Sequence, residues 1–153
     1  MKAKETYTLL ISSQNATNRL GATKRNLQYY INWSSILPKS EDPGQKYQLK
    51  FVMTSLFTAA GFNDIYSLNI DFGGSNVFEQ TGSKSSYIGL VYPSFVSTFN
   101  QYYYTMAKNN DNLPIIVEYP NNSLITVNLV NSTVGSGTVY NYEYLLTLQF
   151  TPI

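Results

Sequence analysis

The sequence predicts an all-β protein, a single jelly-roll β-sandwich of about eight strands that occupies residues 1–153. Segments with strand-like apolar patterns recur along the chain, polar turns separate them at fairly regular intervals, and no segment is a convincing helix. The first and last strands are both long, which favours a jelly roll of two four-stranded sheets. An immunoglobulin-like sandwich is the alternative, although Trp33 lacks the flanking cysteine pair of that fold.

The clearest strand is residues 46–57, KYQLKFVMTSLF. Its largest apolar side chains share one parity: Tyr47, Leu49, Phe51, Met53 and Phe57. The opposite parity carries polar or short side chains: Gln48, Lys50, Val52 and Thr54. Because successive side chains of a strand point to opposite faces, this pattern predicts a long strand with one face in the core.

The remaining segments are expected to surround this strand. Strands are predicted at residues 6–12, 26–33, 63–72, 87–92, 113–119, 124–131 and 140–151. Residues 94–112 fit either a helix or a strand, and we favour extended structure for 101–107. A single helical turn is expected at 34–37, and residues 1–5 are expected to be flexible. The turn PNNS between 113–119 and 124–131 predicts that these two strands form a hairpin.

The composition favours contact with other proteins. Charged residues make up only 12% of the chain, and the sequence is instead rich in Asn, Ser, Thr and Tyr. Amides, hydroxyls and phenols lose less on desolvation than Lys or Glu, and protein interfaces are depleted in Lys and Glu. The codon usage of an AT-rich genome is an alternative explanation for the Asn and Tyr content.

The formal net charge of +1 predicts no strong attraction to nucleic acid or to anionic membranes. The charge is nevertheless uneven, because residues 1–25 contain five cations and one anion, Glu5. We consider these cations a candidate basic arm: Lys2, Lys4, Arg19, Lys24 and Arg25. The arm could contact an acidic neighbour or packaged nucleic acid, and a solvated edge is the simpler interpretation. No apolar run is long enough for a membrane span or a secretory signal.

The sequence offers little catalytic chemistry. It contains no histidine and no cysteine, which excludes serine triads that use histidine, zinc sites of the His or Cys type, disulfides and thiolate sites. A glycoside hydrolase based on paired carboxylates remains a formal alternative, with four candidate acids: Asp64, Asp71, Glu118 and Glu143. The run NNDN at 109–112 has oxygen ligands for calcium but one carboxylate, so it is better explained as a turn. We therefore predict no catalytic residues, no metal, no cofactor and no enzyme activity.

Tyrosines are the candidate interface residues. Tyr102, Tyr103 and Tyr104 are consecutive, so at least one must point away from the core of an extended segment. Tyr30 lies on the parity opposite the apolar residues of its strand. Exposed tyrosines are good interface residues because a large ring buries area at little entropic cost, and they can also stack on sugars or bases. The alternative is that tyrosine is simply a favourable strand residue.

The pattern as a whole resembles a known lineage. The segments YTLLISSQNATN, YYINWSSILP, KYQLKFVMTS, YPNNSLITVNLVN and YLLTLQFTPI resemble the small single jelly-roll proteins of large eukaryotic double-stranded DNA viruses and their relatives. The resemblance covers most of the chain and rests on strand pattern and spacing. It implies a minor capsid or penton-like component that assembles with itself or with other capsid proteins, with no catalytic residues to transfer.

These observations predict a structural protein of a virion, made in the host-cell cytoplasm, that acts through protein–protein assembly as an oligomer. Contact of the basic arm with nucleic acid is a secondary possibility. The main alternative is a carbohydrate- or receptor-binding β-sandwich that uses exposed Tyr and Asn side chains. A carboxylate glycoside hydrolase is the third hypothesis.

Overall fold

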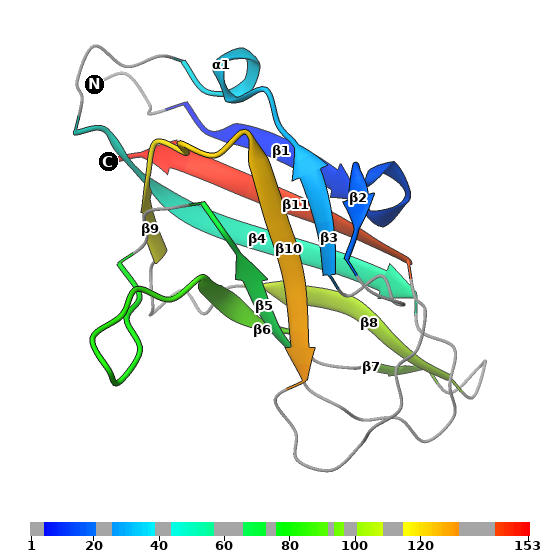
Figure 1. The fold of residues 1–153 in the computed structure, drawn as a ribbon. Helices are drawn as coiled ribbons and strands as arrows, with labels where there is room; N and C mark the ends of the chain where they lie inside the picture. The colour runs from blue at the N-terminus through cyan, green and yellow to red at the C-terminus, as the bar shows by residue number, and fades with distance from the viewer. Residues whose placement is uncertain are drawn as a thin grey trace.

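Two antiparallel β-sheets face each other and enclose the hydrophobic core (Figure 1). The computed structural model describes residues 5–20, 26–38, 44–56, 66–72, 76–91, 94–96, 101–108, 115–131 and 143–153. Of residues 54–56, 66, 91, 94–96, 101–108, 131 and 143, it describes the backbone alone. The expectation of flexible residues 1–5 falls, except for Glu5, outside this part of the chain.

We name the first sheet A and the second sheet B. Sheet A consists of β1 (Tyr7–Ser12), β4 (Lys46–Leu56), β7 (Ser94–Val96), β8 (Gln101–Lys108), β9 (Ile115–Glu118) and β11 (Glu143–Pro152). Its order is β1-β11-β4-β8-β7, and β9 pairs with the other half of the β4 edge. Sheet B has the order β2-β3-β10-β5-β6, with these bounds: β2 (Asn18–Arg19), β3 (Asn26–Tyr30), β10 (Leu124–Asn131), β5 (Tyr66–Ile70) and β6 (Tyr87–Val91).

The strand pairs are nested along the chain, from its two ends towards its middle. The first strand β1 pairs with the last strand β11, β3 pairs with β10, β4 pairs with β8 and β9, and β5 pairs with β6. This is the connectivity of a jelly roll, so the predicted fold class is confirmed. An immunoglobulin sandwich instead places strands A, B, E and D in one sheet and C, F and G in the other, which does not match this order.

The strand that was clearest in the sequence is also central in the structure. β4 lies between β11 on one side and β8 and β9 on the other. Tyr47, Leu49, Phe51 and Met53 are all buried, whereas Val52 and Lys50 face outward. The alternation is confirmed over residues 46–53, and Phe57 lies outside the described residues.

An aromatic cluster fills one end of the core. Trp33 lies edge-on to Phe72 and Phe150, with ring centroids 5.8 and 5.7 Å apart, and Phe72 and Phe150 are 5.9 Å apart. Such edge-to-face pairs contribute about 0.5–1.5 kcal/mol beyond burial of their area. The Trp33 indole Nε1–H donates to the Asn122 carbonyl at 2.7 Å, which ties the cluster to the turn before β10.

Close approach of the two sheets requires a glycine in β6. The register of β6 against β5 shifts between Leu68 and Asn69, and both Ile88 and Gly89 are buried. A Cβ atom on Gly89 would lie 2.5 Å from Cε1 of Phe51, on the facing sheet. The ring of Phe51 therefore occupies the space that any other residue at position 89 would need.

The structure corrects several sequence-based expectations. The predicted hairpin is wrong, because β9 pairs with β4 in sheet A whereas β10 pairs with β3 and β5 in sheet B. The predicted strand 26–33 ends at Tyr30, and Trp33 instead begins the short helix α1 (Trp33–Ile36), one residue earlier than the expected turn at 34–37. The 3₁₀ turn η1 (Ser13–Asn15), β2 and β7 were not anticipated. Residues 101–108 are extended, as favoured.

The other predicted strands are present: β10 has the predicted bounds, β6 begins at the predicted residue, and β1, β5, β9 and β11 differ from the prediction by one or two residues at one described end. In the part of the chain that the structure describes, no helix is long and apolar enough to cross a membrane.

Candidate functional site

An apolar patch lies on the outer face of sheet A, and it consists of Leu10, Val52 and Leu145. Their side chains are 64%, 37% and 45% exposed. Thr147 of β11 is the cross-strand partner of both Leu10 in β1 and Val52 in β4, and Leu145 lies two residues before it on the same face. The three side chains are thus diagonal or next-but-one neighbours on a single surface. We call this surface the outer-face patch.

The outer face of sheet B is built from amides and hydroxyls. The Asn18 amide donates to Oε1 of Gln28 at 3.1 Å, and the Gln28 amide donates to Oγ1 of Thr126 at 3.4 Å. These three residues belong to the neighbouring strands β2, β3 and β10, so the bonds cross the sheet. We call Asn18, Gln28 and Thr126 the amide row.

Tyr30 lies at one end of this face. It is 66% exposed and is the cross-strand partner of Leu124, which is 41% exposed. The Tyr30 backbone N–H donates to Oγ1 of Thr17 at 3.0 Å, which fixes the backbone at the base of the ring. The outward parity predicted for Tyr30 is confirmed, and its role in an interface stays a prediction.

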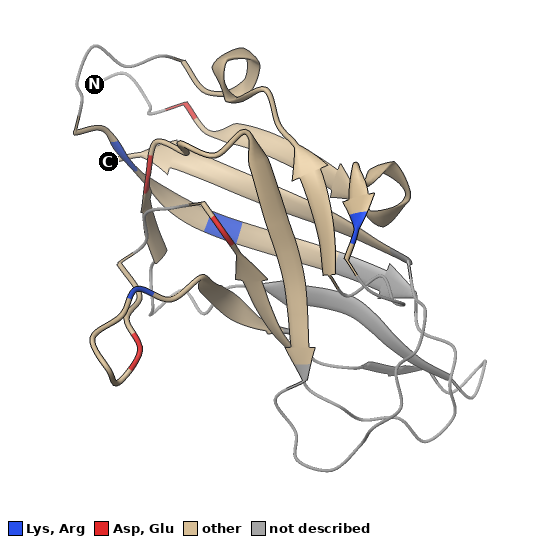
Figure 2. Cartoon of the chain, in the orientation of Figure 1, with Lys and Arg blue, Asp and Glu red and all other residues tan. Residues whose placement is uncertain are grey.

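Charged side chains lie mainly at the edges and ends of the sandwich (Figure 2). The outward side chains that the structure describes on β3, β5 and β10 are all uncharged, as are those on β1 and β11. β4 contributes Lys46 and Lys50 to the outer face of sheet A. Both faces therefore present broad neutral areas with a few exposed apolar side chains.

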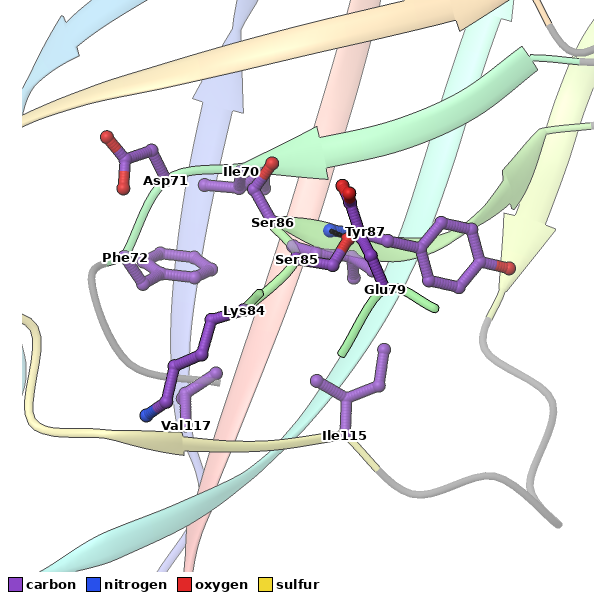
Figure 3. Close-up of a pocket in the computed structure, with 11 residues that line it drawn as sticks. Ile70, Asp71, Phe72, Glu79, Lys84, Ser85, Ser86, Tyr87, Ile115 and Val117 are labelled. Carbon is purple, nitrogen blue, oxygen red and sulfur yellow. Dashed lines mark hydrogen bonds between the residues drawn. The ribbon is translucent and has the colours of Figure 1, made fainter. Parts of the chain in front are cut away.

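A pocket of about 370 Å³ opens between sheet B and β9 (Figure 3). Its apolar lining comes from core residues: Ile70, Phe72, Ile88, Ile115 and Val117. Its polar lining comes from the end of β5 and from the segment that leads to β6: Asp71, Glu79, Lys84, Ser85, Ser86 and Tyr87. The volume is at the lower end of the range for small-molecule sites.

The pocket is shaped by a loop that is tied to β9. Asn76 accepts from the Ile116 backbone N–H through its side-chain oxygen at 2.9 Å, and its own N–H donates to the Ile116 carbonyl at 3.1 Å. Within the loop, Phe78 and Lys84 form an isolated β-bridge. The position of Asp71 on the rim of a pocket was not expected from the sequence, because the pocket is formed by contacts between segments that are distant in sequence, 70–72, 79–88 and 115–117.

The four candidate acids are not gathered into one site in the described structure. Asp71 is exposed at the rim of the pocket, whereas Glu118 is exposed at the end of β9, next to Lys46 of β4 in register. Glu143 is described by its backbone alone, at the start of β11, and Asp64 lies outside the described residues. Among the described residues, no group of three or more acids could hold a metal ion. The run at 109–112 lies outside them.

The remaining predicted residues are described only in part. Tyr102, Tyr103 and Tyr104 lie in β8, and their backbones alone are described. Arg19 of the basic arm is exposed on β2, at the edge of sheet B. The other members of the arm lie outside the described residues: Lys2, Lys4, Lys24 and Arg25.

The buried ionisable groups of the core are phenols. Burial raises the pKa of Tyr29, and the hydrogen bond of 2.9 Å between its hydroxyl and that of Tyr144 acts in the opposite direction. Burial also raises the pKa of Tyr47, with smaller contributions from Tyr119 and Tyr7. The hydroxyls of Tyr29 and Tyr144 satisfy each other in the apolar interior, and neither Tyr29 nor Tyr47 lines the pocket.

Sequence reasoning missed the outer-face patch. Leu10 and Leu145 occupy the outward parity of β1 and β11, between neighbours that point into the core. The sequence signal that could have indicated the patch was the presence of leucines at the otherwise polar, outward positions of these two strands. Their proximity could be recognised only once β1 was known to pair with β11.

No protein-family model matches the chain, and no curated protein matches it in sequence. The exposed faces and the pocket are therefore the observations that bear on function.

Proposed function

We propose that this protein is a viral structural protein, a single jelly-roll minor capsid or penton-like component that acts through protein–protein assembly. The observation that carries the proposal is the broad neutral area on each outer face of the sandwich, which on sheet A is interrupted by Lys46, Lys50 and Glu118. Outward side chains described on β1, β3, β5, β10 and β11 carry no charge, and several are apolar and well exposed. The resemblance to small jelly-roll proteins of large DNA viruses supports the same role.

The energetics of desolvation favour burial of these faces. Covering an unpaired charge costs several kcal/mol, whereas a neutral amide or hydroxyl that finds a hydrogen-bond partner costs little. Exposed apolar side chains contribute roughly 25 cal/mol per Å² when a partner covers them. The outer-face patch on sheet A and the pair Tyr30 and Leu124 on sheet B supply such side chains.

The partners in this proposal are further copies of the chain and other capsid proteins, and the location is the virion after synthesis in the host cytoplasm. We propose no catalytic function and no cofactor. Contact of the basic arm with nucleic acid remains a minor part of the proposal, and Arg19 is the member of the arm whose exposure is established.

The test is the composition of purified particles. Particles of the source virus should be banded on a density gradient, washed with high salt and analysed by quantitative mass spectrometry. We expect this chain to co-purify with the major capsid protein at a fixed ratio. Its recovery only from the soluble fraction, as a monomer, would contradict the proposal.

A carbohydrate-binding or receptor-binding role is the second candidate. The amide row next to the exposed ring of Tyr30 favours it, because amides bond sugar hydroxyls and an aromatic face can stack on a sugar ring. A glycan array would test this role, with Tyr30→Ala as the variant. Binding that is lost in Tyr30→Ala and kept in Leu145→Ala on the opposite sheet would favour it, and an array without binders would exclude it. A carboxylate glycoside hydrolase has less support, because Asp71 lines the pocket whereas Glu118 does not.

A further inference from the structure

β1 is an edge strand of sheet A, and the short helix α1 contacts it. β1 pairs with β11 along one edge, and no strand in the described part of the chain pairs with its other edge. The exposed backbone groups of such an edge can pair with another strand, and proteins usually prevent this with short strands, charges, prolines or bulges. The six residues of β1, YTLLIS, contain no charge, proline or glycine.

The other described edges are protected. β2 has two residues and carries Arg19, and β7 has three residues. β6 contains an irregularity in register at its pairing with β5. β9 is bonded on its free side by Asn76, through the side-chain oxygen and the backbone N–H. β1 is therefore the described edge at which strand addition meets the least resistance.

We propose that two copies of this chain associate through antiparallel pairing of β1 with β1 about a two-fold axis, which joins their A sheets into one continuous sheet. This inference rests on the proposed assembly function and specifies the contact through which assembly occurs. The partner is a second copy because β1 is uncharged and can be self-complementary, so that no charged group is left without a counterpart.

The register follows from the side chains. In a two-fold antiparallel pair, residues that face each other must share a parity, so one residue of β1 lies opposite its own copy. Pairing at Leu10 places the most exposed leucine of the strand against its equivalent and sets Thr8 opposite Ser12. On the inner side, Leu9 lies opposite Ile11. Leu9 and Tyr7 have the core parity but are only partly buried at this edge, so an added strand would cover them further.

The pairing also extends the outer-face patch. Leu10 is the member of the patch nearest the open edge, with Leu145 and Val52 behind it on β11 and β4. Two copies joined at Leu10 would present one apolar strip across both A sheets. Overlap of five residues gives about four to six interchain backbone hydrogen bonds, each of which contributes roughly 0.5–1.5 kcal/mol.

The chain contains no cysteine, which makes disulfide trapping a direct test. Opposed residues of an antiparallel pair have Cα atoms about 4.5–5.5 Å apart, within reach of a disulfide. Leu10→Cys should therefore give a disulfide-linked dimer under mild oxidation. Thr8→Cys and Ser12→Cys should each remain monomeric on a non-reducing gel, whereas their mixture should form a crosslinked pair. Val52→Cys on the same face is the matched control and should not crosslink.

A charge exchange provides an independent readout in solution. Leu10→Lys and Leu10→Glu should each raise the dimer dissociation constant at least about tenfold, because like charges would lie directly opposite one another. An equimolar mixture of the two variants should restore the dimer as a heterodimer. Leu10 is exposed, so neither variant is expected to prevent folding.

The outcomes separate the two proposals. The β1 pairing would be overturned if Leu10→Lys still formed oligomers and if Val52→Cys crosslinked as strongly as Leu10→Cys. The proposed assembly function would not be affected by that result. A wild-type chain that is monomeric in solution and gives no Leu10→Cys dimer would also overturn the pairing, even if the chain is found in particles. Absence from particles, with an intact β1 dimer, would overturn the capsid function instead.

Discussion

The inner and outer faces of the same strands follow different chemical rules. Inward side chains of β4 and β11 are large, apolar and almost completely buried, and they fit closely against aromatic partners. Outward side chains of the same strands are partly or fully exposed, and apart from Lys46 and Lys50 of β4 those that the structure describes are uncharged. The inner face therefore determines whether the chain folds, whereas the outer face is free to determine what the folded chain contacts. Substitutions on the two faces are therefore expected to change the free energy of unfolding by very different amounts.

The largest effect is expected at the centre of the aromatic cluster. Phe150 contacts Trp33, Phe72 and Tyr47 in edge-to-face geometry. Phe150→Ala should lower the free energy of unfolding by about 3–5 kcal/mol, through lost burial and the cavity left behind. Chemical denaturation measures this loss. Gln149→Ala, at the neighbouring exposed position, is the control and should change the free energy of unfolding by less than about 0.5 kcal/mol. Equal effects of the two would contradict the division between the faces.

The contact between the sheets at Gly89 is expected to be the next most sensitive. Gly89→Ala would place a Cβ against the ring of Phe51 and should cost about 1–3 kcal/mol of the free energy of unfolding. A smaller residue at position 51 should relieve the clash, so Phe51→Leu combined with Gly89→Ala should cost less than the two single changes added together. Strict additivity in this double-mutant cycle, measured by denaturation, would show that the ring does not limit position 89.

The buried phenol pair predicts a smaller loss. Tyr144→Phe removes the hydroxyl that shares a hydrogen bond of 2.9 Å with Tyr29, and it should cost about 1–2 kcal/mol of the free energy of unfolding. Replacing both tyrosines by phenylalanine should recover part of that loss, because no hydroxyl then remains in this apolar site. A double variant that is less stable than Tyr144→Phe alone would contradict this explanation.

The same phenols predict a dependence on alkaline pH. The pKa values of Tyr29 and Tyr47 are raised in the folded protein, so the unfolded chain loses these protons first as the pH rises. Their contribution to stability should be fully present below the ordinary tyrosine pKa of about 10 and should decline above it. Denaturation midpoints measured at increasing pH should fall above that value. The decline should be shallower in Tyr29→Phe and Tyr47→Phe, and an unchanged slope would contradict the assignment.

The smallest effect on stability is expected on the outer face. Leu145→Lys should change the free energy of unfolding by less than about 0.5 kcal/mol, because the side chain is already half in solvent. It should nevertheless weaken association with partners, since it places a charge in the outer-face patch. Denaturation and sedimentation measure the two effects separately. If Leu145→Lys lowered the stability of the fold and left association unchanged, the outer face would support folding and not association, which would contradict this account.

The inner face was largely predictable from the sequence. Alternation in residues 46–53 correctly assigned the buried parity of β4, and the same rule placed Tyr30 outward. Ile31 and Trp33 are both buried, in keeping with the parity that they share with Tyr29, but the strand itself ends at Tyr30, three residues before the predicted end. The neighbouring strand β10 sets the end of β3, because Tyr30 pairs with Leu124, the first residue of β10. The Ile31 N–H then donates to the Ser123 carbonyl in the turn that precedes β10.

The predicted hairpin failed for a related reason. A short turn between two strands predicts that they pair, but Pro120 has no N–H for a ladder, and the chain crosses from sheet A to sheet B between β9 and β10 (Figure 1). Long-range pairing of β9 with β4 and of β10 with β3 and β5 decides the outcome. The outer-face patch could not be predicted for the same reason, since it combines residues 10, 52 and 145 through pairings that local sequence does not encode.

The central claim is that this sandwich is a component of an assembly, and sedimentation velocity of the 153-residue chain tests it most directly. Across about 1–100 µM, we expect the sedimentation coefficient to rise with concentration as copies associate, because affinities of this order are sufficient for assembly at high local concentration. Addition of the major capsid protein should shift the chain into a faster species. A constant monomer value across this range, with and without that partner, would contradict the claim.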